Sequence, residues 1–120
     1  MILIKNGRVV DPVTNTDKIM DVLIKDNKIA EVSEHIEASG AQVIDAAGLV
    51  VAPGLVDTHV HFRDPGFTYK EDIETGARAA AKGGFTMVVC MANTKPAVDN
   101  IETLDYIQKK GEKTGINVLQ

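Results

Sequence analysis

The sequence has little cysteine, no long apolar run and no excess of basic residues, and each absence excludes a class of protein. Its single cysteine, Cys90, excludes an intrachain disulfide framework, and the apolar run around it predicts a buried thiol. No apolar run approaches the roughly 20 residues that span a bilayer. The formal net charge of −4 comes without the basic stripe typical of nucleic-acid-binding proteins. Neither a membrane nor nucleic acid is therefore expected as a partner.

The first residues also lack the marks of export. Residues 1–5 have no basic stretch, and no long apolar core or small-residue cleavage site follows them. Cytoplasm is therefore the expected location. Charged residues make up 25% of the chain, which is typical of folded globular proteins. With 120 residues and 44% hydrophobic content, the chain can form one or two small domains.

Short strands joined by turns are predicted for residues 1–52, the first of two expected domains. Asn6-Gly7 and Asp26-Asn27 are dipeptides that tolerate the positive φ angles of tight hairpins, and each lies between two strand-like runs. The predicted strands cover residues 1–5, 8–10, 19–25, 28–32, 42–45 and 49–51. This pattern predicts a small antiparallel sheet assembly. His35 lies in this half among polar residues and is expected to be a solvated surface histidine rather than a ligand.

A different pattern, strand–helix–strand–helix–strand, follows in residues 53–120, the second expected domain. The first helix is expected to take Thr68 as its N-cap, with Glu71 completing a capping box, and to end at Gly83-Gly84. The second helix is expected to begin at Asp99. The strands are predicted over residues 55–62, 86–92 and 116–119. Strands that alternate with helices in this way indicate an α/β fold with βα units and a parallel sheet.

The number of these units indicates an incomplete barrel. A TIM-type (β/α)8 barrel needs about 250 residues, whereas residues 53–120 hold only the first two to three βα units of one. The apolar run at residues 86–92 is typical of a parallel strand covered on both faces. The last predicted strand stops at Gln120 in the middle of the pattern. The chain is therefore expected to be the N-terminal part of a longer protein.

Ionisable side chains occupy one face of the predicted strand at residues 55–62 and its continuation. Because side chains alternate faces along a strand, this face carries Asp57, His59, His61 and Arg63. The opposite face carries residues suited to pack under a helix, namely Val56, Thr58, Val60 and Phe62. Two imidazoles two residues apart can reach one metal ion. Since the carboxyl end of a barrel strand faces the active site, this interpretation is favoured over a half-exposed strand with two incidental histidines.

Asn93 follows the second predicted strand at the same end of the sheet. By itself, an Asn before a proline-containing loop is typical of a turn. Next to Arg63 it becomes a candidate ligand contact, because neighbouring parallel strands bring their carboxyl ends into one cleft. The role of Asp57 stays open between orienting a histidine and anchoring the strand.

Residues 57–66 and 91–96 carry a resemblance to the amidohydrolase superfamily and, within it, to the dihydroorotase family. The resemblance implies that His59 and His61 are zinc ligands, in an active site that holds two zinc ions when complete. It implies that Arg63 and Asn93 hold the substrate carboxylate. It also implies that residues 1–52 form part of a small β-sandwich. The general acid/base aspartate and further ligands of the family would follow residue 120, so no catalytic residue is expected within the chain.

The activity implied by this resemblance is the reversible hydrolysis of dihydroorotate to N-carbamoyl-L-aspartate in pyrimidine biosynthesis, with the isolated chain inactive. One alternative is another cyclic-amide hydrolase of the hydantoinase or allantoinase type. Arg63 argues against it, because a neutral hydantoin ring offers no carboxylate. A second alternative is a non-catalytic homologue with an assembly role, although both visible metal ligands are intact. A homodimer and an association with aspartate transcarbamoylase stay open as partners.

Overall fold

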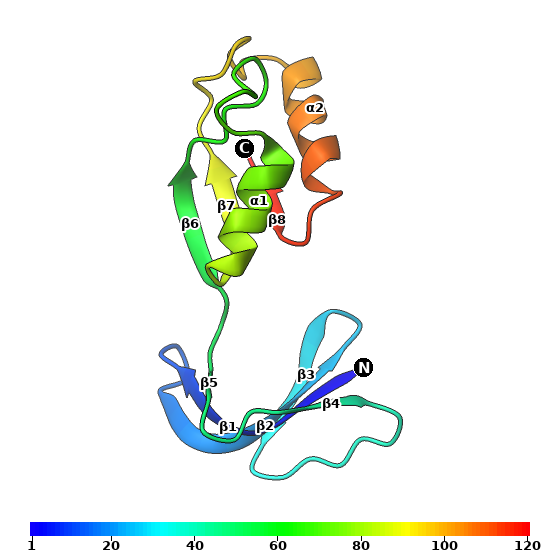
Figure 1. Cartoon of the computed structure of the whole chain (residues 1–120). Helices are drawn as coiled ribbons and strands as arrows, with labels where there is room; N and C mark the ends of the chain where they lie inside the picture. Colours follow the sequence, from blue (N-terminus) through cyan, green and yellow to red (C-terminus); the bar gives the residue numbers. More distant parts are fainter. The chain divides into compact units, whose positions relative to one another are not determined.

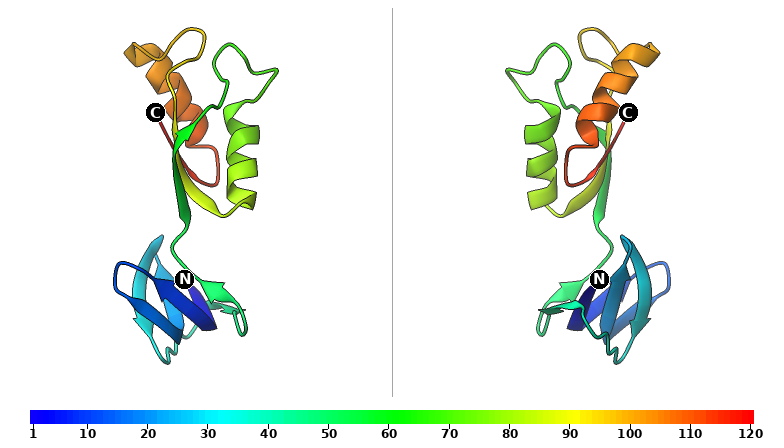
Figure 2. Two further views of the ribbon diagram at one scale, coloured as in Figure 1. Left: turned by 90° about the vertical axis from the view of Figure 1, so that its left-hand side faces the viewer. Right: turned by 90° about the vertical axis from the view of Figure 1, so that its right-hand side faces the viewer.

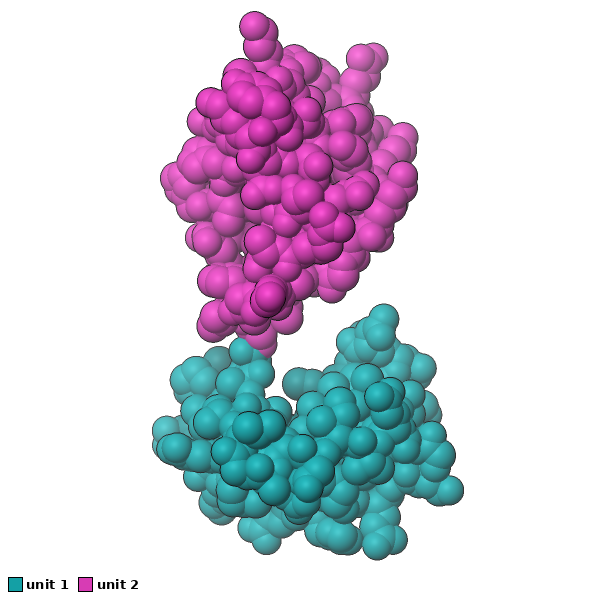
Figure 3. All heavy atoms as spheres, viewed as in Figure 1, with its two compact units in different colours: residues 1–53 teal, residues 54–120 magenta.

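A computed structural model describes residues 1–120, and the chain divides after Pro53 into two units (Figure 3). Unit 1 comprises residues 1–53 and contains only strands; unit 2 comprises residues 54–120 and contains strands and helices. The α/β class predicted from the sequence is thereby confirmed. No helix of the structure is long and apolar enough to cross a membrane.

Unit 1 is a five-stranded mixed sheet (Figure 1). Its strands are β1 (Ile2–Asp11), β2 (Thr16–Lys25), β3 (Lys28–Ser33), β4 (Gln42–Asp45) and β5 (Val50–Val51). The order is β3-β2-β1-β4, and β5 also pairs with β1. Strands β1, β2 and β3 are antiparallel neighbours, whereas β4 and β5 run parallel to β1. The prediction of a purely antiparallel assembly is wrong, because residues 34–41 cross from one side of β1 to the other and enter β4 in the direction of β1.

The two predicted hairpins have different outcomes. Asp26-Asn27 forms the hairpin between β2 and β3, and both residues have positive φ, 51° and 58°, as a primed turn requires. Asn6-Gly7 instead lies within the continuous strand β1, where the pairing with β2 shifts between Ile4 and Gly7. Asn6 has a φ of 62°, and a Cβ at Gly7 would overlap the Val51 side chain. The dipeptide is therefore a β-bulge, and the hairpin predicted there is wrong.

The carboxylate of Asp21 on β2 holds this bulge in place. It is buried and accepts hydrogen bonds from the backbone N–H of Asn6 at 2.9 Å and of Ile36 at 3.0 Å. The Lys5 ammonium lies 3.4 Å away and donates to the Ile36 carbonyl at 3.1 Å. Burial by itself would raise the pKa of Asp21, but these donors outweigh it and the pKa is lowered. Asp21 therefore ties β1, β2 and the segment after β3 together as an ionised group.

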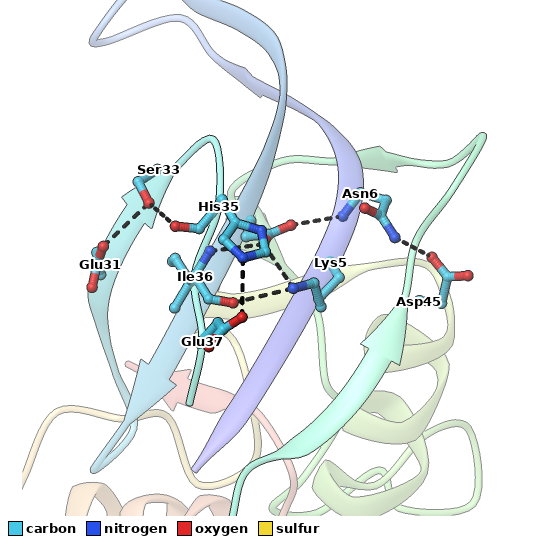
Figure 4. Close-up of polar contacts among 9 residues, drawn as sticks. Lys5, Asn6, Glu31, Ser33, His35, Ile36, Glu37 and Asp45 are labelled. Carbon is cyan, nitrogen blue, oxygen red and sulfur yellow. Dashed lines mark hydrogen bonds and ion pairs between the residues drawn. The ribbon is translucent and has the colours of Figure 1, made fainter. Parts of the chain in front are cut away.

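His35 lies on the surface beside this cluster, as the sequence predicts. Its side chain is 69% exposed, and its Nε2 is 3.4 Å from the Glu37 carboxylate (Figure 4). His35 and Glu37 belong to no group of three or more histidine, cysteine, aspartate or glutamate side chains that could hold a metal ion. His35 is therefore a solvated surface residue.

Unit 2 is a three-stranded parallel sheet with two helices that contact each other (Figures 1 and 2). Its elements in chain order are β6 (Leu55–Val60), α1 (Ile73–Lys82), β7 (Phe85–Cys90), α2 (Ile101–Gly111) and β8 (Asn117–Leu119). The sheet order β6-β7-β8 follows the chain, so each helix connects neighbouring parallel strands. One hydrophobic core takes its buried residues from α1, β7, α2, β8 and the segment after β6, and Val60 of β6 packs against it. The buried residues are Phe62, Ile73, Ala77, Val88, Cys90, Ile107 and Val118.

Strand β7 is covered on one face only, whereas the sequence predicts cover on both. Val88 and Cys90 are buried in the core, but Met87 and Val89 are half-buried. The difference arises because α1 and α2 share one core, and no element of the chain packs on the other face. Cys90 is a buried thiol as predicted, and burial raises its pKa to about 11, so it stays protonated at neutral pH.

The helices begin later than the sequence patterns predict. Asp72, rather than Thr68, caps α1: its carboxylate accepts from the Thr75 backbone N–H at 2.8 Å, and the Thr75 hydroxyl accepts from the Asp72 N–H at 3.3 Å. Thr68 is exposed in the turns before the helix. Asn100, rather than Asp99, caps α2 by the same type of bond. Both corrections share a reason: an Asp or Asn directly before a residue that enters the helix offers a short acceptor for the free N–H groups.

Candidate functional site

The two histidines lie together at the carboxyl end of β6. Strand β6 ends at Val60, two residues earlier than predicted, so that His59 belongs to the strand and His61 follows it. Their ring centroids are 5.2 Å apart and the rings are inclined by 58°. Both side chains are exposed. The structure thus brings the two imidazoles together in an open position that a ligand can reach.

A hydrogen bond of the Asp57 side chain contributes to ending β6 at Val60. The Asp57 carboxylate accepts a hydrogen bond from the backbone N–H of His59 at 3.0 Å. The pairing of β6 with β7 becomes irregular between Asp57 and Val60, where this bond replaces a ladder contact. Of the two roles left open by the sequence, strand anchoring is therefore the one that the geometry supports, because the carboxylate contacts the histidine backbone and not its ring.

Phe62 points into the core, so that its neighbours in the sequence, His61 and Arg63, point away from it. Its ring is buried against α1, where Gly76 leaves room that a Cβ would take from it. Val60 also packs against this core. The other two residues of the predicted apolar face, Val56 and Thr58, are exposed, with Val56 at 53%. That part of the prediction is wrong, because the hydrophobic core of unit 2 includes Phe62 and reaches Val60 but no earlier residue of β6.

Asn93 lies beside His61, so the two strand ends meet as predicted. The backbone N–H of Met91 donates to the Val60 carbonyl at 2.9 Å and continues the β6–β7 pairing past the strands. The Asn93 Oδ1 is then 2.9 Å from the His61 Nδ1. Because the amide oxygen can only accept, Nδ1 is the donor of this hydrogen bond, and Nε2 is the ring nitrogen left for another partner. Histidine ligands of metal ions typically donate their second N–H in this way.

Arg63 is half-buried and its guanidinium has no carboxylate within ion-pairing distance. Its Cζ lies 5.1 Å from the centroid of the Phe67 ring, a cation–π contact. The backbone N–H of Phe67 also donates to the Arg63 carbonyl at 2.8 Å. The Arg63 guanidinium therefore stacks on the Phe67 ring but pairs with no carboxylate. Its N–H donors remain available to an anionic ligand.

Asp64 has a structural part that the sequence did not reveal. Its side chain is 0% exposed, and it accepts hydrogen bonds from the Lys110 ammonium at 2.7 Å and the Tyr106 hydroxyl at 2.9 Å. The bond to Asp64 is the main reason why the pKa of Lys110 is raised. The only signal in the sequence was an acidic residue beside Arg63 in a turn, because its partner Lys110 lies 46 residues further along the chain.

The two imidazoles are of a ligand type that suits a zinc ion. Neutral imidazole is a preferred zinc ligand, and a catalytic zinc site uses three protein ligands and one open position. His59 and His61 supply two, and no group of three or more histidine, cysteine, aspartate or glutamate side chains in the chain could hold a metal ion. The chain therefore presents two neighbouring imidazoles, with the Asn93 amide bonded to one of them and Arg63 two residues further along the chain.

Known proteins with similar sequences are dihydroorotases. The dihydroorotase of Clostridioides difficile (strain 630) is 60% identical over 121 residues, covering 100% of this chain and 29% of that protein. The dihydroorotase of Streptococcus pneumoniae serotype 4 is 58% identical over 118 residues, covering 98% of this chain and 28% of that protein. The chain thus spans less than a third of the length of these relatives.

Solved structures similar to the chain include hydantoinases, which are also cyclic amidohydrolases. The L-hydantoinase (dihydropyrimidinase) from Arthrobacter aurescens superposes with a TM-score of 0.84 at 31% identity, covering 98% of this chain and 26% of that one. A D-hydantoinase structure gives a TM-score of 0.75 at 36% identity over the same shares. A family model described as dihydro-orotase-like matches residues 48–120, which is more than half of the chain. The chain therefore belongs to the dihydro-orotase-like family of cyclic amidohydrolases.

Proposed function

We propose that the chain is part of a dihydroorotase. This enzyme hydrolyses dihydroorotate reversibly to N-carbamoyl-L-aspartate in pyrimidine biosynthesis. The observation that carries this proposal is the unpaired guanidinium of Arg63 next to the pair of histidines. The substrate has one carboxylate and one ring amide, and the site offers one group suited to each. The identity of 58–60% with proteins named dihydroorotase supports the same activity.

In this proposal His59 and His61 bind zinc, in a site of two ions when complete. Bound zinc would polarise the amide carbonyl and lower the pKa of water. Asn93 contributes through its amide oxygen, because the hydrogen bond with His61 Nδ1 fixes the orientation of the ring and leaves Nε2 as the nitrogen that can bind a metal ion. The general acid/base is assigned to no residue of the chain.

Arg63 and Asn93 hold the substrate carboxylate. The planar guanidinium can donate two parallel charge-assisted hydrogen bonds to a carboxylate. The amide oxygen of Asn93 is taken by His61, but its amide nitrogen remains as a third donor. The carboxylate would thereby fix the orientation of the ring, with the amide turned toward the histidines.

The same proposal assigns domains to the chain. Residues 53–120 are the first two to three βα units of a TIM-type barrel, and residues 1–52 are part of a β-sandwich. The parallel order β6-β7-β8 supports the first assignment, as does the location of His61, Arg63 and Asn93 after the carboxyl ends of their strands. The mixed sheet of unit 1 supports the second.

A hydantoinase activity is the second candidate, favoured by the TM-score of 0.84 with the L-hydantoinase. A shared fold does not select a substrate, however, because one fold serves many reactions. The unpaired guanidinium of Arg63 favours dihydroorotase over hydantoinase activity, because dihydroorotate has a carboxylate for it to bind and a hydantoin ring has none.

The deciding experiment is Arg63→Ala in a full-length enzyme that contains this sequence, assayed with two substrates. Loss of a charged hydrogen-bond partner costs about 2–5 kcal/mol, or about 30- to 4,000-fold in kcat/KM for dihydroorotate. Dihydrouracil is the same ring without the carboxylate, so its slow hydrolysis should change less than about 2-fold. Arg63→Lys keeps the charge but not the planar fork and should restore activity in part. Equal losses on both substrates would contradict the proposal and favour the hydantoinase candidate.

A further inference from the structure

The segment that carries Arg63 is joined to helix α2 by the buried side chain of the next residue, Asp64. Asp64 is the only buried carboxylate of this unit, and both of its partners, Tyr106 and Lys110, lie on α2. Lys110 is itself 29% exposed and stacks on the Tyr106 ring at 5.1 Å. The three side chains therefore form one cluster that joins the turn after β6 to a helix more than 40 residues later in the chain.

The same turn is also joined to the segment that carries Asn93. The backbone N–H of Lys95 donates to the Pro65 carbonyl at 3.2 Å. Gly66 has a φ of 92°, and a Cβ there would overlap the Lys95 carbonyl. Asp64 thus lies between Arg63 and the contact with the neighbouring loop. A movement of Asp64 would displace Arg63 directly, whereas the loop that carries Asn93 is also held to His61 by the Asn93 side chain.

An ion pair with a fully buried carboxylate costs desolvation free energy, so it is an inefficient way to stabilise a turn. Replacement of such a pair by apolar residues of similar volume is often neutral or stabilising, while removal of one partner leaves an uncompensated charge. Its directional bonds, however, restrict the backbone to one position more strictly than apolar packing does. A geometric task is therefore a better explanation for Asp64 than a contribution to net stability.

We propose that Asp64, held by Lys110 and Tyr106, is a positioning residue that sets the location of the Arg63 guanidinium and so the affinity for the substrate carboxylate. The inference rests on the function proposed above for Arg63. Asp64 itself is fully buried and contacts no ligand, so it acts only through its neighbour. A displacement of about 1 Å in a substrate-holding group can cost about 100-fold in rate, so even a small shift of this turn is measurable.

The test is Asp64→Asn in a full-length enzyme that contains this sequence, with KM and kcat measured for dihydroorotate and dihydrouracil. Asn is nearly isosteric and can still accept from Tyr106, but it cannot neutralise Lys110. We expect KM for dihydroorotate to rise about 10-fold or more, with zinc content unchanged and kcat/KM for dihydrouracil altered less than about 2-fold. Lys110→Met should reproduce this selective pattern, and Lys110→Arg should restore part of the affinity.

Asp21→Asn is a matched control. Asp21 is also a buried carboxylate with a lysine partner, with 3% side-chain exposure against 0% for Asp64 and an ammonium at 3.4 Å against 2.7 Å. It lies in unit 1, which holds none of the proposed ligands. Both variants should lower the melting temperature, but only Asp64→Asn should change the ratio of kcat/KM between the two substrates. A similar loss on both substrates in both variants would overturn the inference and leave Asp64 a stabilising residue only.

Two further measurements keep the inference separate from the proposed function. If Arg63→Ala itself does not distinguish the substrates, the proposed function fails first. If it does, Asp64→Asn in the Arg63→Ala background should have no added effect on KM for dihydroorotate, because a residue that acts through Arg63 has nothing left to position. An additive effect would overturn the inference. Should Asp64→Asn fail to fold, Tyr106→Phe decides: a selective rise in KM supports the inference, and an unchanged KM overturns it.

Discussion

Asn93 combines two tasks at the scale of the single residue. Its amide oxygen accepts from the His61 Nδ1 at 2.9 Å, while its amide nitrogen is free to donate to a ligand. The sequence suggested only the second task, because a turn-forming Asn beside Arg63 resembles a substrate contact. The contact with His61 adds the first task, which under the proposed function is to orient a metal ligand.

These two tasks can be separated by two substitutions at residue 93. Asn93→Ala removes both and should weaken zinc binding about 10- to 100-fold, as loss of a group that orients a ligand typically does. It should also lower kcat/KM for dihydroorotate, less than Arg63→Ala does, because a neutral donor is lost. Asn93→Asp keeps an acceptor for His61 and should retain zinc, but its charge should repel the substrate carboxylate. Zinc affinity by competition with a chelator and kcat/KM measure the two effects.

The histidines provide the reference for that comparison. His59→Ala and His61→Ala should each remove most zinc and activity, and the double variant should be little worse, since either loss opens the same site. His35→Ala, at an exposed residue of unit 1, should change neither quantity. Normal zinc affinity in Asn93→Ala would show that the contact with His61 has no influence on the metal.

At the scale of the secondary-structure element, the contact between Phe62 and α1 determines which way the residues after β6 point. Gly76 lies in α1 opposite the Phe62 ring and lacks the Cβ that would overlap it. Helical glycine costs about 1 kcal/mol relative to alanine, so propensity alone favours alanine here. The close approach of ring and helix is the reason for the glycine.

Gly76→Ala should therefore destabilise the protein in spite of the better helix propensity. Overpacking of a core typically costs about 1–3 kcal/mol, and the strain should push Phe62 and with it His61 and Arg63. The shift in the urea unfolding midpoint and the loss of kcat/KM measure the two consequences. Gly115→Ala is the control, because a Cβ there meets nothing within 4 Å; a midpoint equal to that of Gly76→Ala would contradict the packing argument.

At the scale of the whole molecule, the proposed site is incomplete within the chain. The two imidazoles lie together and one of them is bonded to the Asn93 amide, and no group of three or more metal-ligating side chains is present. The 120-residue chain alone is therefore expected to bind zinc weakly and to show no turnover of dihydroorotate above background. Turnover by a homogeneous preparation of the chain, sensitive to His59→Ala, would contradict this expectation.

The order of elements in both units could be predicted from local patterns. Asp26-Asn27 forms a hairpin because two neighbouring residues tolerate positive φ between two strand-forming runs. The spacing of His59 and His61 places both rings at one strand end, and the break at Gly83-Gly84 ends α1. In each case, residues close in the sequence contain the whole physical cause.

The remaining features depend on partners that are distant in the sequence. Asn6-Gly7 has the same composition signal as a hairpin, but Asp21 on β2 and Val51 at β5 make it a bulge. Strands β4 and β5 are parallel to β1 because of the path of the crossover. The bonds of His61 to Asn93 and of Asp64 to Lys110 join residues 32 and 46 positions apart. The sequence by itself determined which chemical groups the site contains, and the tertiary structure decided how they are held, because only packing selects which distant segments become neighbours.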